Sequence, residues 1–168
     1  MDGVFITAEE IDVMMHAIND IYDKIARTFL DTEVYSHRFI IRGALAYGEI
    51  SHGNNITQGV SKEISADDDY KKNLLFGLPM IQAFNSEKKA PPFGVFIHES
   101  ARRRGCLQGR YYQWYKDENL QNELRDNIIS YFEWCKQFSN YLELEKEKAH
   151  KYSELAQEFF TNRNITNK

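Results

Sequence analysis

Residues 38–50 read Arg-Phe-Ile-Ile-Arg-Gly-Ala-Leu-Ala-Tyr-Gly-Glu-Ile, and this stretch decides the fold class. Aromatic and aliphatic residues that favour strands dominate it. Gly43 and Gly48 interrupt them, and a glycine within a strand indicates a bulge or the close approach of another group. The stretch therefore predicts a strand whose glycines are fitted to backbone geometry or to close packing.

A strand and a helix are expected on the N-terminal side of this stretch. Residues 3–6 read as a short strand, and Thr7 with Glu10 has the spacing of a capping box, so a helix is expected to begin near Ala8. Apolar residues then recur at intervals of three and four, which predicts one buried helix face. That face comprises Ile11, Met14, Met15, Ile18, Tyr22, Ile25 and Phe29.

A long polar loop is expected on the C-terminal side, from Ser51 to about Lys72. Its three adjacent aspartates, residues 67–69, lack the alternating spacing of a calcium loop, so a solvated loop is favoured over a cation site. A helix with Pro79 in its first turn follows Phe76-Gly77. Further strands are expected at residues 93–97 and around residues 111–115.

The last third of the chain is expected to be helical. One apolar face comprises Leu120, Leu124, Ile128, Phe132, Cys135 and Phe138, and a second segment carries Tyr152, Leu155, Ala156 and Phe159, with Asn140 as the expected break. We expect an α+β core over residues 1–118 and a helical extension, residues 119–168, packed on the same domain.

Composition narrows the class of protein. With 168 residues and 14% aromatic content the chain is expected to fold as one domain. No apolar run reaches the length of a membrane helix, and Cys106 and Cys135 suit buried, reduced thiols, so the expected location is the cytoplasm. A net charge of −4 gives no general attraction for nucleic acid.

Three segments, taken in order, resemble core motifs of class III nucleotide cyclases. They are Arg42–Glu49, then Phe76-Gly77 opening a helix, then Pro92–Ser100, and the likeness covers roughly residues 2–104. It implies a ferredoxin-like, cyclase-type sheet with helices on one face, incomplete at the N-terminus. It also assigns Gly43, Gly48, Phe76 and Gly77 to the surroundings of the nucleotide.

The chain departs from the family at the catalytic positions. The family holds two Mg²⁺ or Mn²⁺ ions with two aspartates; Asp2 is similar to the second, and the strand that carries the first is lacking. On the helix, Ile81 stands where the family has a ribose-binding asparagine, and Asn85 stands where it has a phosphate-binding arginine. Asn85 can donate a hydrogen bond to a phosphate, but it supplies no charge.

These departures predict a degenerate, catalytically inactive cyclase-like domain that binds a nucleotide, with a nucleoside triphosphate among the candidates, or a protein partner. A bacterial nucleotide cyclase, of the type that cyclises pyrimidine nucleotides among others, is the first alternative. A nucleic-acid-binding module, resting on the basic and aromatic residues between Arg102 and Tyr115, is the second. We also expect a homodimer, because family members act as dimers and an absent central strand would leave sheet edges unpaired.

Overall fold

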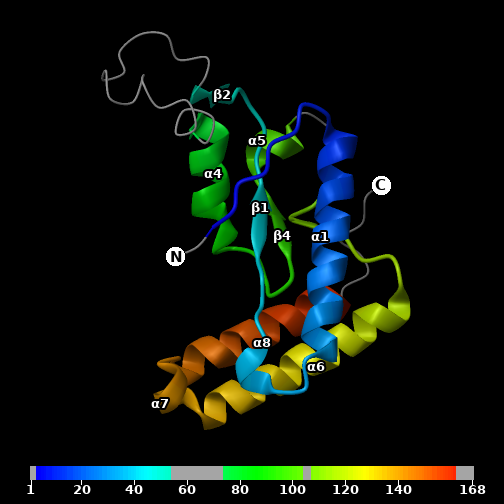
Figure 1. The fold of residues 1–168 in the computed structure, drawn as a ribbon, viewed down its shortest axis with the longest axis vertical. Coiled ribbons are helices and arrows are strands. Elements are labelled where there is room, and N and C mark those ends of the chain that lie inside the picture. Colours follow the sequence, from blue (N-terminus) through cyan, green and yellow to red (C-terminus); the bar gives the residue numbers. More distant parts are fainter. Residues whose placement is uncertain (1–2, 54–73, 104–106, 162–168) are drawn as a thin grey trace.

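The computed structural model of the chain describes residues 3–53, 74–103 and 107–161. These residues form a mixed α+β structure, which confirms the expected class, with a small sheet between helices (Figure 1). The expected loop falls almost entirely on residues 54–73, and its three aspartates therefore lie outside the described residues.

The main sheet has three short strands. β1 (Gly43–Leu45) is one edge, β4 (Val95–Ile97) is the centre and β5 (Tyr111–Tyr112) is the other edge. β1 runs parallel to β4, whereas β5 runs antiparallel to it. The expected strands at 93–97 and near 111–115 are thus present, although each is shorter than its apolar run.

A helix connects the two parallel strands, as parallel pairing requires. α4 (Leu78–Glu87) lies between them in sequence, begins immediately after Gly77 and carries Pro79 in its first turn, so the predicted helix start is confirmed. A separate antiparallel ribbon of β2 (Ser51–His52) and β3 (Leu75–Phe76) leads into it.

The strand predicted over residues 38–50 is far shorter than expected. The short 3₁₀ helix η1 (Tyr35–His37) precedes it, and only Gly43–Leu45 pairs with a neighbour in the main sheet. β1 can pair only where β4 offers a partner, and β4 is itself limited by the preceding Pro91-Pro92 and by Phe93, whose φ is 55°. A positive φ is incompatible with an extended strand.

The expected N-terminal strand is wrong. Residues 3–6 adopt no strand, and Val4 is 88% exposed. A strand needs a neighbour to satisfy its backbone groups, and the described residues provide none here. The first helix, α1 (Ile11–Asp31), begins after Glu10 and receives no side-chain cap, so the predicted capping box is also wrong.

Helices cover both faces of the main sheet. Adjacent strand residues point to opposite faces. The hydroxyl of Tyr112 donates to Asn19 of α1 over 2.9 Å, whereas that of its neighbour Tyr111 donates over 3.4 Å to the backbone oxygen of Lys89, just after α4. α4 packs beside β1 and β4 and lies on the opposite side of the sheet from α1 in Figure 1. The Tyr111 ring also contacts Phe159, near the end of α8 (Lys146–Thr161), with centroids 5.8 Å apart. The expectation of helices on one face is therefore wrong.

The C-terminal helices lie across one end of the sheet and run obliquely to α1 in the view of Figure 1. They are α6 (Glu118–Gln137), the short α7 (Ser139–Leu142) and α8. The predicted apolar face of α6 is buried up to Cys135, but Phe138 is exposed. The chain turns at Glu143, which has a left-handed φ of 50°, rather than at Asn140.

One continuous apolar core joins α1, the sheet, α6 and α8. Phe29 of α1 meets Phe93 edge to face, with ring centroids 5.3 Å apart, and Tyr115 meets Phe159 of α8 at 5.7 Å. Cys135 is a free, buried thiol in this core, as expected, while Cys106 lies outside the described residues. Within the described part of the chain, no helix is both long and apolar enough to cross a membrane.

Candidate functional site

Three of the residues that the resemblance assigns to a nucleotide site meet at the N-terminal end of α4. A Cβ atom added at Gly48 would lie 2.8 Å from Pro79 Cγ, and one added at Gly77 would lie 2.6 Å from the backbone oxygen of Glu49. Phe76 pairs with Ser51 in the adjoining ribbon. The structure therefore brings Gly48, Phe76 and Gly77 together.

Gly43 lies elsewhere, on the face of the sheet that α1 covers. A Cβ atom at Gly43 would lie 2.5 Å from the hydroxyl oxygen of Tyr22, which is closer than real Cβ contacts come. Gly48 instead has a φ of 154°, a conformation that side chains disfavour. The prediction that both glycines are fitted to packing or to backbone geometry is confirmed, and their role toward a nucleotide stays a prediction.

Asn85, the other assigned residue on α4, does not lie at this place. Asn85 is exposed and follows Gly77 by eight positions, which is about 12 Å along the helix axis. Asp2 lies outside the described residues, so the expected Mg²⁺ or Mn²⁺ site stays a prediction. Within residues 3–53, 74–103 and 107–161, no group of three or more His, Cys, Asp or Glu side chains suits a metal ion.

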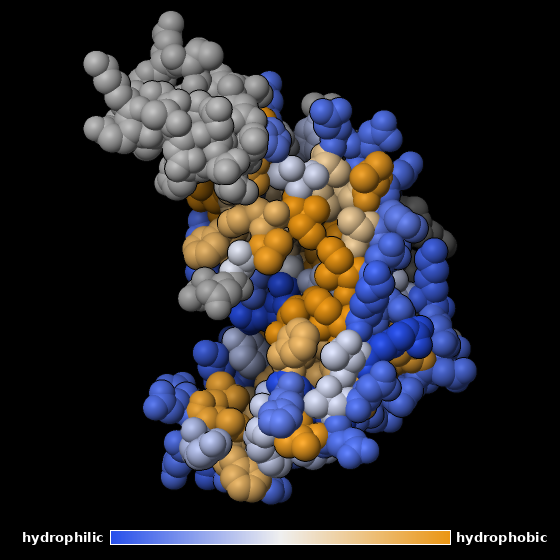
Figure 2. Space-filling model, in the orientation of Figure 1, coloured by the Kyte–Doolittle hydropathy of each residue, from blue (hydrophilic) through white to orange (hydrophobic). Residues whose placement is uncertain are grey.

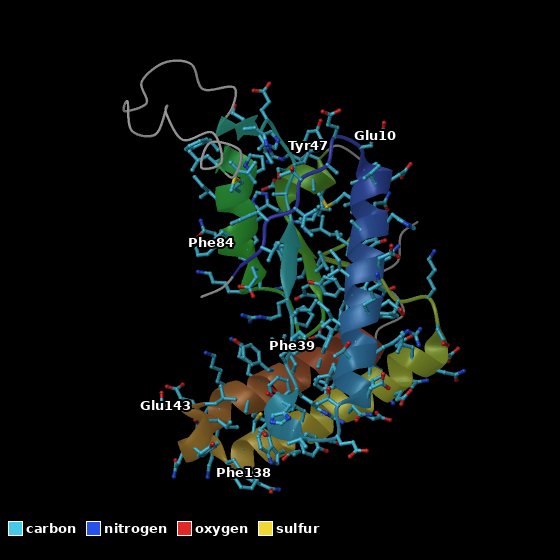
Figure 3. The ribbon with its side chains drawn as sticks, viewed as in Figure 1. Glu10, Phe39, Tyr47, Phe84, Phe138 and Glu143 are labelled. Atoms are coloured by element: carbon cyan, nitrogen blue, oxygen red, sulfur yellow. The ribbon has the colours of Figure 1, made fainter. Side chains whose placement is uncertain are left out.

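The outer face of α4 is apolar and open. Leu78, Ile81 and Phe84 are 64%, 60% and 58% exposed, and Phe84 points outward from the helix in Figure 3. Their spacing of three places them on one side of the helix. We define these three residues as the α4 face. It offers no polar chemistry, but exposed apolar surface of this kind marks contacts with other molecules.

The sequence analysis predicted this helix but did not predict the α4 face. Its apolar residues do not themselves show which side of the helix is exposed, whereas the structure leaves Ile81 and Phe84 more than half exposed. One feature of the sequence could have indicated the exposed face. Ile81, an apolar residue, stands at a position where the resembled family has a substrate-binding side chain, and a substrate-binding position must be accessible to solvent.

The carboxyl ends of the parallel strands β1 and β4 are where open sheets commonly bind ligands. Here local hydrogen bonds join the segments that follow the two strands. Ser100 Oγ accepts from the backbone N–H of Tyr47 over 2.9 Å, and His98 Nδ1 accepts from the N–H of Ser100 over 3.1 Å. The His98 side chain thus caps the start of the short α5 (Glu99–Arg102), and Ser100 ties this helix to the residues after β1.

Aromatic residues near the arginines do not form a platform for stacking bases. Tyr111, Tyr112 and Trp114 are all buried, and the indole N–H of Trp114 donates to the oxygen of Phe93 over 2.7 Å. Burial raises the pKa of the Tyr111 and Tyr112 hydroxyls, as expected for core positions. The aromatic part of the nucleic-acid interpretation is therefore wrong for these three rings.

Comparisons with known proteins add no relative. No protein-family model, curated protein or solved structure gives a significant match to this chain.

Proposed function

We propose that this chain is a catalytically inactive, cyclase-like domain that works by pairing with a second copy of itself through the α4 face. The observation that carries the proposal is the exposure of Leu78, Ile81 and Phe84 on one side of one helix. Burying a large aliphatic or aromatic side chain stabilises a complex by about 1.5–3 kcal/mol. Two copies of the face would supply six such side chains.

The residues that this chain has at the resembled family's substrate-binding positions support the loss of catalysis. At the position where the resembled family binds ribose through an asparagine, this chain presents the exposed side chain of Ile81. Isoleucine donates no hydrogen bond, and Asn85 carries no charge for a phosphate. Position 81 thus suits an apolar contact better than a contact with ribose.

The spacing of the face supports a second copy as the partner. A two-fold symmetric contact must be self-complementary, so that each residue meets its counterpart across the axis. Leu78 and Phe84 lie three positions before and after Ile81. An axis through Ile81 therefore places two antiparallel α4 helices together, with Leu78 of each copy against Phe84 of the other.

The edge position of β1 is compatible with this arrangement. β1 ends the three-stranded sheet on the side away from β5, and α4 packs beside it. Exposed sheet edges also recruit partners. The resemblance adds that class III cyclases act as dimers with their sites at the subunit interface, and α4 corresponds to the helix that lines those sites.

The proposal is tested with opposite charges at the axis. Ile81→Lys and Ile81→Glu should each give monomers by light scattering after size exclusion, because like charges would face each other across the axis. An equal mixture of the two variants should recover dimers, because lysine then faces glutamate. Tyr141→Lys, at an exposed position on α7, is the matched control and should remain dimeric.

Two outcomes would contradict the proposal. Retention of the dimer mass by both charged variants would show that α4 is not the interface. A mixture that stays monomeric would show that Ile81 does not lie at a two-fold axis. Circular dichroism checks that each variant is folded, which is expected because Ile81 is mostly exposed.

A further inference from the structure

A cavity of about 340 Å³ lies between α6, α8 and the segment that enters β1. Figure 2 shows this side of the molecule hollowed between the part that carries α4 and the part that carries α7 and α8, with strongly hydrophilic atoms at its base. The volume is near the lower end of small-molecule sites, which span about 300–1,000 Å³. It therefore suits a small ligand rather than a dinucleotide.

One side of the cavity is cationic, and Arg42 is its fixed component. Arg42 Nη1 donates to the Tyr152 hydroxyl over 3.0 Å, and Nη2 lies 2.9 Å from Glu87 Oε1. The guanidinium also lies 5.1 Å from the centroid of the Tyr152 ring. These contacts hold the side chain in place at 24% exposure and leave further N–H donors for a ligand.

Lys148 adds a second positive charge beside the first. It lines the same cavity, and its Nζ atom lies 6.0 Å from the centroid of the Tyr152 ring. Arg42 and Lys148 are the charged residues among those that line the cavity, and Glu87, which is paired with Arg42, offsets one of the two charges. Glu143, Glu145 and Glu147 line the adjoining depression and weaken the attraction for anions further. This balance suits one phosphate group better than a triphosphate.

The other side of the cavity is aromatic. Tyr131 of α6 lines it with a partly exposed ring. The neighbouring Phe132 is buried, and its ring centroid lies 5.4 Å from that of Tyr131 and 5.8 Å from that of Tyr152. Leu144 also lines this side. Aromatic side chains that line a site beside cations stack planar bases while the cations hold the phosphate.

We infer that this cavity binds a nucleoside monophosphate, with its phosphate held by Arg42 and Lys148 and its base against the partly exposed ring of Tyr131. None of these residues belongs to the α4 face, so the site is separate from the proposed dimer contact. The cavity also lies apart from Gly48, Phe76 and Gly77, where the resemblance places a nucleotide. The site thus adds a binding activity to the proposed function.

Calorimetric titration with AMP, GMP, CMP and UMP tests the inference. At least one should bind with Kd below about 1 mM, and Lys148→Ala should weaken it about tenfold, because a hydrogen bond to a charged group is lost. Lys151→Ala is the matched control, since Lys151 is an exposed lysine of α8 that does not line the cavity, and it should bind as the parent does.

Three results would overturn the inference. They are no binding of any of the four nucleotides, equal binding by Lys148→Ala, and inorganic phosphate that binds as tightly as the best nucleotide. Titrating Ile81→Lys separates this site from the dimer contact. That variant should bind the nucleotide as the parent does, whatever its mass.

Discussion

The hydroxyl of Tyr22 donates a hydrogen bond over 3.3 Å to the backbone oxygen of Gly94, which joins the middle of α1 to the start of β4. The same hydroxyl lies directly against Gly43 on the neighbouring strand. Tyr22 is buried, and its ring lies 5.6 Å from that of Trp114. One side chain thus joins the first helix to two strands of the sheet.

Substitution of Tyr22 should change how stability depends on pH. Burial raises the pKa of Tyr22 well above the ordinary value of 10.0, and the charge of Glu87 raises it further. The folded state then holds the proton more tightly than the unfolded state, so this stabilisation is complete below pH 10 and is lost as the pH rises above it. Tyr22→Phe should therefore lose less stability between about pH 9 and pH 11.

Urea denaturation at a series of pH values measures this difference. Tyr22→Phe should still lose some stability as the pH rises, although less than the parent. Burial also raises the pKa of Tyr115 and Tyr131 to about 12, and both tyrosines remain in the variant. Tyr141→Phe, at an exposed ring, is the matched control. Identical slopes for the parent and Tyr22→Phe would contradict the prediction.

Alanine at the two packed glycines should destabilise the fold. In Gly43→Ala the new Cβ atom would press on the buried Tyr22 hydroxyl, and in Gly48→Ala it would meet Pro79 in a backbone conformation that alanine disfavours. Each change should lower the free energy of unfolding by about 1–3 kcal/mol. Gly3→Ala has nothing within 4 Å of its added atom and should be neutral. Unchanged denaturation midpoints for both packed positions would refute this account.

The helices were predictable from the sequence, but the extent of the strands was not. The apolar stripes of α1 and α6 recur with the helical period, so Ile18, Tyr22 and Leu124 are buried as expected. Strand length depends on the partner strand. β1 is short because the proline pair at residues 91–92 and the positive φ of Phe93 limit the length of β4. The strand was predicted from residues 38–50 alone, and that stretch does not show how long its partner strand is.

The two candidate surfaces were only partly predictable. Ile81 and Asn85 were singled out as departures from the resembled family, but the α4 face became visible only when the structure placed Leu78, Ile81 and Phe84 outward together. The cavity needed the fold, because Arg42 and Lys148 are distant in sequence and meet only when α8 packs beside the entry to β1.

The purified chain should have no nucleotide cyclase activity on ATP, GTP, CTP or UTP with Mg²⁺ or Mn²⁺. The exposed Ile81 and Asn85 supply neither the ribose contact nor the charge that such a reaction needs, and electrostatic stabilisation is usually the largest catalytic contribution. Chromatographic assay of cyclic nucleotide together with pyrophosphate release measures this. Sustained formation of both, abolished by Asp2→Ala, would show that the chain is an enzyme.

Sedimentation equilibrium of the unmodified chain, over a concentration range of about two orders of magnitude, tests the proposed self-association most directly. The α4 face should hold two copies together, so the measured mass should be twice that of one 19.8 kDa chain, with dissociation only at the lowest concentrations. A single folded species at the mass of one 19.8 kDa chain throughout the range would contradict the proposal.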